Sequence, residues 1–175
     1  SRRDLFLRNP RQWLYRHIPC NLALYYDFGV RYIREILVYP EPGPDDALVM
    51  QTTSRLAEQY GASLTCVRFV ETDATEEELQ REKTYLEQVI KLSATPARTL
   101  VIRGKRFEDA VADISAGYDL LVMGAPLERG LSALFGTAKD QLTEMAGCSV
   151  LRLSTPHDTV HAPLAPVTVT SDRNL

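Results

Sequence analysis

The sequence has few of the residues that build disulfide frameworks and metal sites. Its 175 residues include three cysteines and three histidines, and the cysteines show no CxxC spacing or other pairing pattern. We therefore expect buried, reduced thiols of a reducing compartment such as the cytoplasm. His157 and His161 lie in a proline-containing segment without helical periodicity, where two solvated histidines are more typical than a metal pair.

Long apolar runs and an excess of basic charge are also missing. No run approaches the roughly 20 apolar residues of a membrane-spanning helix, and no signal peptide opens the chain. The chain as given is therefore expected to be soluble and cytoplasmic, which leaves open that it belongs to the cytosolic face of a larger membrane protein. The net charge is −3 and the basic residues form no block, so we expect no nucleic-acid partner.

Sequence signatures of catalysis are absent as well. The chain has no GxSxG elbow, no HExxH motif and no cysteine–histidine pairing in a recognisable context. Asp109 and Asp113 share one face of a predicted helix, where solvated side chains are more typical than an acid–base pair. We therefore predict that the protein is not an enzyme.

A regular alternation of strand and helix patterns dominates the rest of the sequence. Five short apolar runs predict strands, and four segments between them predict helices. The predicted strands are residues 35–40, 62–71, 97–104, 119–124 and 148–154, and the predicted helices are residues 45–60, 75–93, 107–116 and 137–147. The alternation predicts an α/β fold: an open, mostly parallel five-stranded sheet with helices on both faces, of the Rossmann-like kind. Such sheets bind ligands beyond the carboxyl ends of the strands, where the strand order reverses.

Two helix boundaries carry their own sequence signals. Thr75 and Glu78 have the spacing of a capping box, which predicts the start of one helix. Gly61 follows the last position of the preceding helix and is placed to end it.

The beginning of the chain matches the last helix and strand of this pattern. With a constant offset of 128 residues, Leu5–Tyr25 aligns with Ala133–Leu153, and Cys20 aligns with Cys148. Other matched positions are Phe6 with Leu134, Leu7 with Phe135, Leu14 with Leu142 and Leu22 with Val150. We infer a preceding repeat that ends within residues 1–30, a complete domain at residues 31–154, and a disordered tail or linker at residues 155–175. The alternative is an N-terminal extension of a single domain, which leaves the match unexplained.

A glycine-rich stretch follows the fourth predicted strand. Residues 123–142 have the sequence MGAPLERGLSALFGTAKDQL, with three glycines and a Gly-Thr step at the start of a helix. Glycines let backbone N–H groups approach anionic oxygens, and a helix N-terminus favours negative charge. The stretch lacks the spacing and the Gly-Lys-Thr order of a P-loop. It is therefore either a phosphate-binding loop of another type or only the turn into the last helix.

Several of these features resemble the universal stress protein family. They are the first strand REILVYP, the fourth strand LLVMG, and the glycine-rich stretch that precedes the last helix and strand. The resemblance covers residues 33–154 and again residues 1–27, and it implies an open α/β sheet that associates through its last strand. In one branch of the family, ATP is bound by Gly, two residues, Gly, nine residues, Gly and Ser or Thr, and an acidic residue after the first strand holds the nucleoside.

The nucleotide-binding motif of the family matches this sequence in part. Gly124 matches its first glycine, and Gly136 with Thr137 matches its last pair. Gly130 can partly replace the second glycine, and Glu41 stands where the family has its acidic residue. The resemblance therefore implies a candidate ATP or AMP site at these five residues.

The departures from the motif favour a loop that keeps the family's shape without its ligand. Leu127 stands where the second glycine belongs, and it follows Pro126, which has no N–H to donate. Three cations, Arg103, Arg129 and Lys139, could receive an anion, although charges on such a rim are usually solvated. We therefore expect no firm cofactor, with ATP or AMP as the alternative.

The resemblance implies a function in association and regulation. Tandem domains with altered glycine loops are similar to those on the cytosolic side of membrane transporters, which favours a regulatory module with a transporter domain in the same chain. The alternative is a soluble stress-response protein that binds ATP or AMP. In the tandem interpretation, the strand at residues 21–25 lies against residues 149–153, since two such domains associate through their last strands. The residues of this predicted association edge are Asn21, Ala23, Tyr25, Ser149, Leu151 and Leu153.

Overall fold

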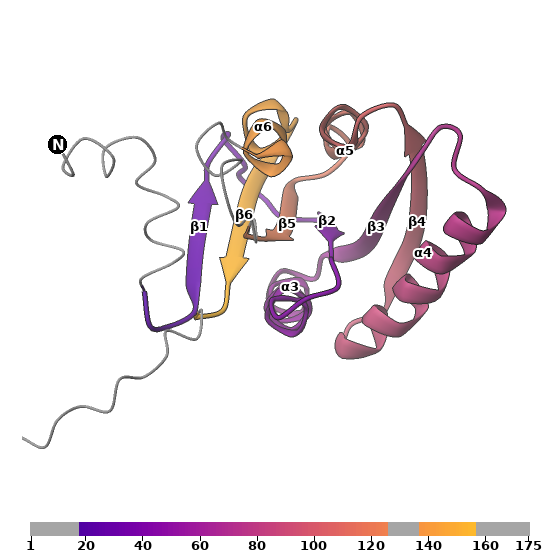
Figure 1. Ribbon diagram of the computed structural model, residues 1–175. Helices are drawn as coiled ribbons and strands as arrows, with labels where there is room; N and C mark the ends of the chain where they lie inside the picture. Colours follow the sequence, from indigo (N-terminus) through magenta and orange to yellow (C-terminus); the bar gives the residue numbers. More distant parts are fainter. Residues whose placement is uncertain (1–17, 126–136, 157–175) are drawn as a thin grey trace, which may run out of the picture.

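A single mixed sheet forms the centre of the fold. In the computed structural model, which describes residues 18–125 and 137–156, six strands are arranged in the order β1-β6-β5-β2-β3-β4 (Figure 1). The strands are β1 (Leu22–Tyr26), β2 (Glu35–Tyr39), β3 (Ser63–Glu71), β4 (Ala97–Gly104), β5 (Leu120–Gly124) and β6 (Ser149–Ser154). The five strands β6, β5, β2, β3 and β4 are all parallel, as the sequence predicts. β1 pairs with β6 as an antiparallel sixth strand.

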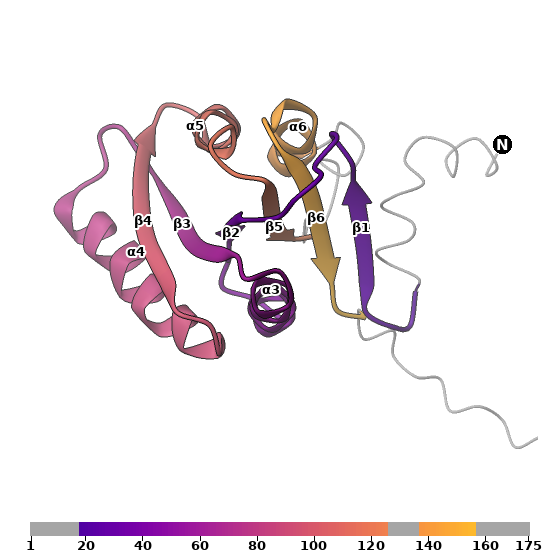
Figure 2. The same ribbon diagram turned by 180° about the vertical axis from the view of Figure 1, so that it is seen from behind.

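Helices cover both faces of this sheet (Figures 1 and 2). One face carries α3 (Asp46–Tyr60) and α4 (Glu76–Val89), which continues into a 3₁₀ turn (Ile90–Leu92), and the other carries α5 (Phe107–Ser115) and α6 (Ala138–Met145). The central strand β2 is therefore shielded on both sides, and its Ile36, Leu37 and Val38 are completely buried. None of the described helices is long and apolar enough to cross a lipid bilayer.

Both predicted helix boundaries are confirmed. The Glu78 N–H donates to Thr75 Oγ1 at 3.3 Å, and the Thr75 N–H donates to Glu78 Oε2 at 2.8 Å, which completes the capping box. Gly61 has a φ of 64° at the end of α3. This left-handed conformation favours glycine and stops the helix.

The position of β1 confirms a prediction that joins distant parts of the sequence. β1 pairs with β6 from Leu22, which lies opposite Ser154, to Tyr26, which lies opposite Val150. The predicted pairing of residues 21–25 with 149–153 is therefore shifted by one residue along each strand. Because β6 has β5 on one side and β1 on the other, the last parallel strand is not an edge of the sheet.

The cysteines are free thiols, as the sequence predicts. The expected burial is confirmed for Cys66 and Cys148, which lie in the two core layers. It is wrong for Cys20, which is exposed because it precedes β1 at one end of the sheet. Burial raises the pKa of the Cys66 thiol to about 12 and that of the Cys148 thiol to about 11. These two thiols are therefore protonated at neutral pH and serve as core packing residues.

Candidate functional site

The strand order reverses between β2 and β5. β2 leads into α3 on one face of the sheet, and α6 follows β5 in the sequence and packs on the other face (Figure 1). The carboxyl ends of the two strands lie side by side, since Tyr39 is opposite Met123. Open α/β sheets bind ligands at this position. Glu41 and Asp45 line it from the β2 side, and Gly124 and Lys139 line it from the β5 side; we refer to the space between them as the switch-point crevice.

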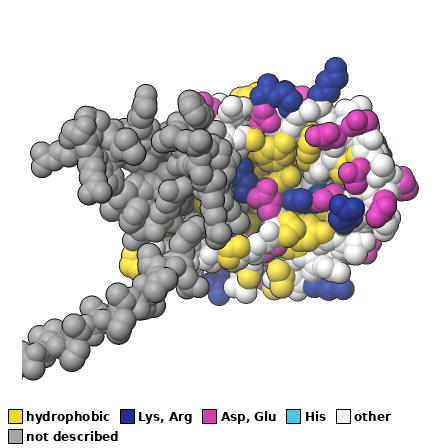
Figure 3. Space-filling view, viewed as in Figure 1, with side chains coloured by type: hydrophobic (Ala, Val, Ile, Leu, Met, Phe, Trp, Pro, Cys, Tyr) yellow, Lys and Arg dark blue, Asp and Glu magenta, His cyan; other side chains and the backbone are white. Residues whose placement is uncertain are grey.

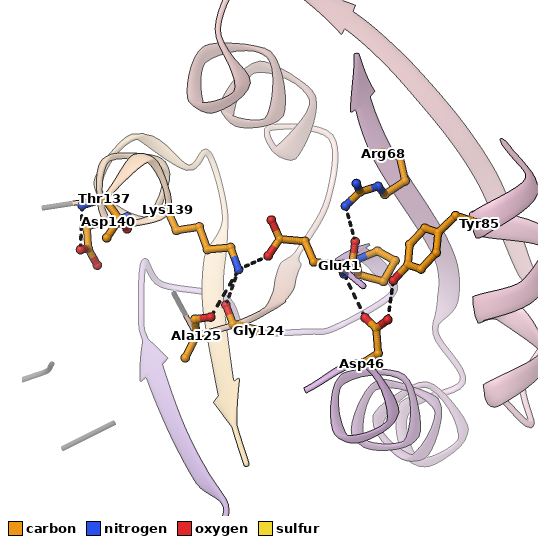
Figure 4. A network of polar contacts seen from close by, with 10 residues as sticks. Glu41, Asp46, Arg68, Tyr85, Gly124, Ala125, Thr137, Lys139 and Asp140 are labelled. Carbon is orange, nitrogen blue, oxygen red and sulfur yellow. Dashed lines mark hydrogen bonds and ion pairs between the residues drawn. The ribbon is translucent and has the colours of Figure 1, made fainter. Parts of the chain in front are cut away.

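Lys139 crosses the switch-point crevice and closes it. Its side chain extends from the first turn of α6, and Nζ donates to the carbonyl oxygens of Gly124 at 3.2 Å and Ala125 at 3.4 Å (Figure 4). The same ammonium group forms an ion pair with the Glu41 carboxylate (Figure 4). The Lys139 side chain is only 12% exposed, so it is not the solvated rim charge that the sequence suggests.

The segment that carries Glu41 is held from two sides. The Glu41 N–H donates to Asp46 Oδ1 at 3.0 Å, at the start of α3. Arg68 on β3 donates from Nη1 to the carbonyl oxygen of Pro40 at 2.7 Å. Pro40 and Pro42 flank Glu41 and restrict its backbone further. The peptide unit before Glu41 is therefore held in place, and Glu41 can leave Lys139 by rotation of its side chain.

Arg68 belongs to a buried polar network behind this segment. Its Nε donates to Glu82 Oε2 at 2.5 Å, and its guanidinium carbon lies 5.0 Å from the ring centre of Tyr39 and 5.1 Å from that of Tyr85. Burial alone would lower the pKa of Arg68, but the hydrogen bond to Glu82 and nearby negative charge outweigh it and raise the pKa. Arg68 is therefore a permanently charged anchor whose cation is stabilised by two aromatic faces.

Asp46 links this network to α3. Tyr85 Oη donates to Asp46 Oδ2 at 2.6 Å (Figure 4). Burial raises the pKa of Asp46, while the hydrogen bonds from Tyr85 and from the Glu41 N–H oppose that shift. Both carboxylate oxygens of Asp46 are thus occupied by partners within the chain.

Asp45 is the exception among the polar groups of the crevice. It is 6% exposed, and its Oδ1 accepts hydrogen bonds from the N–H and the hydroxyl of Thr155, both at 2.7 Å. Its Oδ2 is buried without a hydrogen-bond partner among the described residues, and it lies 3.6 Å from the point where a Cβ on Gly124 would stand. A buried carboxylate oxygen without a donor is costly, so this atom is available to a donor that enters the crevice.

The free space in the crevice is small. With Lys139 bound to Glu41, a volume of about 10 Å³ remains between the described walls. This is about the room that one water molecule needs, whereas sites for small organic ligands have roughly 300–1,000 Å³. The described residues therefore form a closed crevice.

The architecture is shared with solved proteins, although no protein-family model matches the sequence and a comparison with curated proteins gives no match. A universal stress protein in complex with cAMP matches with a TM-score of 0.55 and 18% identity, over 71% of this chain and 99% of that chain. The universal stress protein from Archaeoglobus fulgidus in complex with dAMP gives 0.56 and 15%, over 70% and 98%. Another universal stress protein from Archaeoglobus fulgidus DSM 4304 gives 0.55 and 14%, over 78% of this chain and 51% of that chain.

The fold is that of the universal stress proteins. Within this fold, the predicted site residues Glu41 and Gly124 meet at the switch-point crevice. Gly130 and Gly136 lie outside the described residues, as does Arg129. Arg103 lies at the end of β4 and donates to the carbonyl oxygens of Thr72 and Ala74 at 3.3 and 3.2 Å. It is therefore tied to its own edge of the sheet.

Thr137 is the N-cap residue of α6. Its hydroxyl accepts from the Asp140 N–H at 3.0 Å, and the Thr137 N–H donates to Asp140 Oδ2 at 3.1 Å (Figure 4). Asp140 also accepts from Arg152 Nη1 at 2.5 Å. Burial would raise the pKa of Asp140, but the hydrogen bond and the charge of Arg152 outweigh it and lower the pKa. The residue predicted as a phosphate ligand thus has a structural partner.

The predicted association edge is occupied within the chain. Ala23 lies opposite Leu153 and Tyr25 lies opposite Leu151 in the β1–β6 ladder. Asn21 precedes β1, and Ser149 precedes the part of β6 that pairs with β1. The Ser149 hydroxyl accepts from the Phe28 N–H at 3.0 Å. Four of the six predicted edge residues are therefore in the ladder.

Other classes of site have little support in the described residues. No group of three or more His, Cys, Asp or Glu side chains there is placed to hold a metal ion. On the face seen in Figure 3, the described basic and acidic side chains are interspersed with each other and with apolar ones. The expectation that nucleic acid is not a partner stays a prediction.

Sequence reasoning missed Asp45, Asp46 and Arg68 as parts of the site. Arg68 did carry a signal, because a charged residue in the middle of the buried strand TCVRFVE requires partners. The two aspartates look like ordinary first-turn residues that complement a helix dipole. The contacts of Asp46 arise only after α4 and the segment that follows β2 are brought together. Those of Asp45 require the residue that follows β6 to reach the start of α3.

Proposed function

We propose that this chain is a non-catalytic regulatory and association module with a universal stress protein fold, the second repeat of a tandem in the cytosolic region of a membrane transporter. The register of the β1–β6 ladder is the observation that carries the association part. The closed switch-point crevice supports a role that needs no bound nucleotide.

The ladder has the symmetry expected of two equivalent strands. The offset of 128 residues that aligns the repeat makes Leu24 equivalent to Arg152, and these two residues lie opposite one another. Leu22 lies opposite Ser154. The positions equivalent to them in the other repeat are Val150 and Tyr26, and these two residues also lie opposite one another. Two copies of one strand that associate about a two-fold axis produce this self-complementary pattern. An unrelated N-terminal strand has no reason to be centred on the repeat-equivalent residue.

The length of one similar solved protein also agrees with a tandem. One of the universal stress proteins similar to this chain is matched over only 51% of its own length, so its chain continues well beyond the matched region. We infer that β1 is the last strand of a preceding repeat and that residues 31–154 form the second. In this arrangement the ladder holds the two repeats in one continuous sheet.

Fractionation of cells that express the protein from its native gene tests the transporter context. We expect an antibody raised against this chain to detect a polypeptide longer than 175 residues in the membrane pellet. We expect it to stay there after alkaline carbonate extraction, because a spanning helix is not removed by high pH. Recovery of the polypeptide in the first supernatant would contradict the proposal, and a known peripheral membrane protein serves as the control for extraction.

A second candidate function is nucleotide binding at the switch-point crevice. It is favoured by the solved universal stress proteins that contain cAMP and dAMP, and by a partly buried lysine at the start of α6. Isothermal titration with ATP and AMP, with and without Mg²⁺, separates the candidates. Saturable heat that is lost in Gly136→Val favours a nucleotide sensor, whereas no heat at millimolar nucleotide favours the association module.

A further inference from the structure

The Lys139–Glu41 ion pair has the features of a contact that competes with a ligand. It joins α6 to the segment after β2, across the position where the strand order reverses. The Lys139 side chain is 12% exposed and that of Glu41 is 41% exposed, so the Glu41 side of the pair is more open to water than the Lys139 side. An anion that reaches Lys139 must therefore replace Glu41.

We propose that this ion pair is an intramolecular latch: Glu41 occupies the place of a ligand's anionic group on Lys139, and that group binds Lys139 only when the pair opens. The proposal rests on the second candidate function, since it requires that the crevice can bind a ligand. It gives Glu41 a role opposite to that of an acidic residue that holds the nucleoside. A latch lowers affinity and a ligand-binding carboxylate raises it, so the two roles predict effects of opposite sign.

The hydrogen bonds that position the Glu41 backbone fit the role of a latch. The hydrogen bonds from its N–H to Asp46 and from Arg68 to the Pro40 carbonyl fix the peptide unit that joins Pro40 to Glu41, directly before the Cα of the latch residue. The carboxylate is thus presented to Lys139 without the ordering cost that a free anion has on binding. Opening requires only rotation of the Glu41 side chain toward solvent.

Asp45 indicates what else a ligand must carry. Its Oδ2 is buried beside Gly124 and has no donor within residues 18–125 and 137–156, and Asp45 lines the same crevice as the latch. A ligand that takes the place of Glu41 on Lys139 and also supplies a hydrogen-bond donor to this oxygen satisfies both groups. The class with this chemistry is an anion that carries hydroxyl groups, as in sugar phosphates and nucleotides.

The magnitude follows from the population of the closed state. If the latch is closed in about 90% of molecules or more, the apparent affinity for the ligand is lower than the intrinsic affinity by about 10-fold or more. Removing the Glu41 charge restores the intrinsic affinity. We therefore expect Glu41→Gln to bind AMP at least about 10-fold more tightly than the wild-type chain.

Isothermal titration with AMP and with adenosine tests the latch. The series comprises the wild-type chain, Glu41→Gln, Glu41→Gln combined with Lys139→Met, and Glu58→Gln as a matched loss of one negative charge on an exposed part of α3. We expect tighter AMP binding in Glu41→Gln, loss of that gain when Lys139 is also replaced, and no change in Glu58→Gln. Adenosine, which lacks the anion, should bind Glu41→Gln no better than wild type. Glu41→Ala provides a second unlatched variant, and thermal unfolding confirms that each variant is folded.

Asp45→Asn in the Glu41→Gln background tests the second contact. The variant keeps an oxygen to accept from Thr155 and presents an amide donor where Oδ2 now stands, so it should weaken AMP binding. Equal or weaker AMP binding in Glu41→Gln than in wild type overturns the latch while leaving the nucleotide candidate in place. Absence of AMP binding in every variant overturns both and leaves the association module. If Glu41→Gln gains as much affinity for adenosine as for AMP, the substitution merely widens the crevice. That result overturns the proposal that Glu41 and the ligand's anion compete for Lys139.

Discussion

Replacing Arg152 with alanine lowers the free energy of unfolding by about 3 kcal/mol, the low end of the range for breaking a buried ion pair. Arg152 lies on β6, is completely buried, and donates from Nη1 to Asp140 Oδ1 at 2.5 Å. The change removes the cation beside Asp140 and leaves the space of a large side chain in the core. Urea unfolding followed by circular dichroism at pH 7 measures the loss.

A matched control is available on the surface. Arg98 pairs with Glu35 at 3.0 Å, but the two side chains are 67% and 41% exposed. Exposed pairs contribute about 0–1 kcal/mol, so Arg98→Ala should change the stability little. If the two arginine variants lose similar stability, burial is not what makes the Arg152 pair important.

The Arg152 pair also has a defined pH dependence. Arg152 lowers the pKa of Asp140 below its usual value, so the ionised carboxylate stabilises the fold at and above the ordinary aspartate pKa of about 3.9. This contribution is lost as the pH falls through the lowered pKa. The difference in stability between wild type and Arg152→Ala should therefore be largest near neutral pH and shrink in acid below about pH 4.

Gly147→Ala should be the second most damaging change, at about 2 kcal/mol. A Cβ at this position would stand 2.7 Å from Ala116 Cα and 2.8 Å from Ala116 Cβ, so the turn before β6 and the end of α5 must move apart. That movement also strains the hydrogen bond from the Gly147 N–H to Ser115 Oγ at 2.9 Å. The urea midpoint should fall accordingly.

Gly117→Ala provides the control for this close approach. Its nearest neighbour to an added Cβ is Ile114 O at 3.6 Å, an ordinary contact, so we expect a change within about 0.5 kcal/mol. Adding Ala116→Gly to Gly147→Ala removes the 2.8 Å contact and keeps the 2.7 Å contact with the Cα. The double variant should therefore recover only part of the loss, and full recovery would show that the backbone approach is unimportant.

The parts of the fold that were predictable from sequence depend on local periodicity and on repetition. The capping box of Thr75 and Glu78 involves residues three positions apart, so its spacing is visible in the sequence. The strands are recognisable because the buried parallel positions form short apolar runs. The pairing of β1 with β6 followed from the internal repeat, which supplied information about a contact between distant segments.

The candidate site was less predictable because its contacts cross between elements. Glu41 and Lys139 were each recognised as candidate residues at the ligand-binding edge of the sheet. The amino-acid sequence does not show that their side chains form an ion pair. The meeting depends on how far the segment after β2 reaches over β5, and Arg68 and Asp46 set that reach from other elements. Long charged side chains on a rim are usually solvated, so only the assembled structure distinguishes a latch from two surface charges.

The β1–β6 ladder also has a consequence for the order in which the sheet is completed during synthesis. Tyr26 and Val150 face each other although they are 124 positions apart. At the usual speed of translation, about 5–20 residues per second, β1 leaves the ribosome about 6–25 s before the residue it must meet. In that interval the hydrogen-bonding groups of β1 that β6 later satisfies are open to other nascent chains. Final closure of the sheet at this seam therefore awaits β6, the last of the described strands to be translated, whereas β2 to β5 have neighbours that emerge earlier.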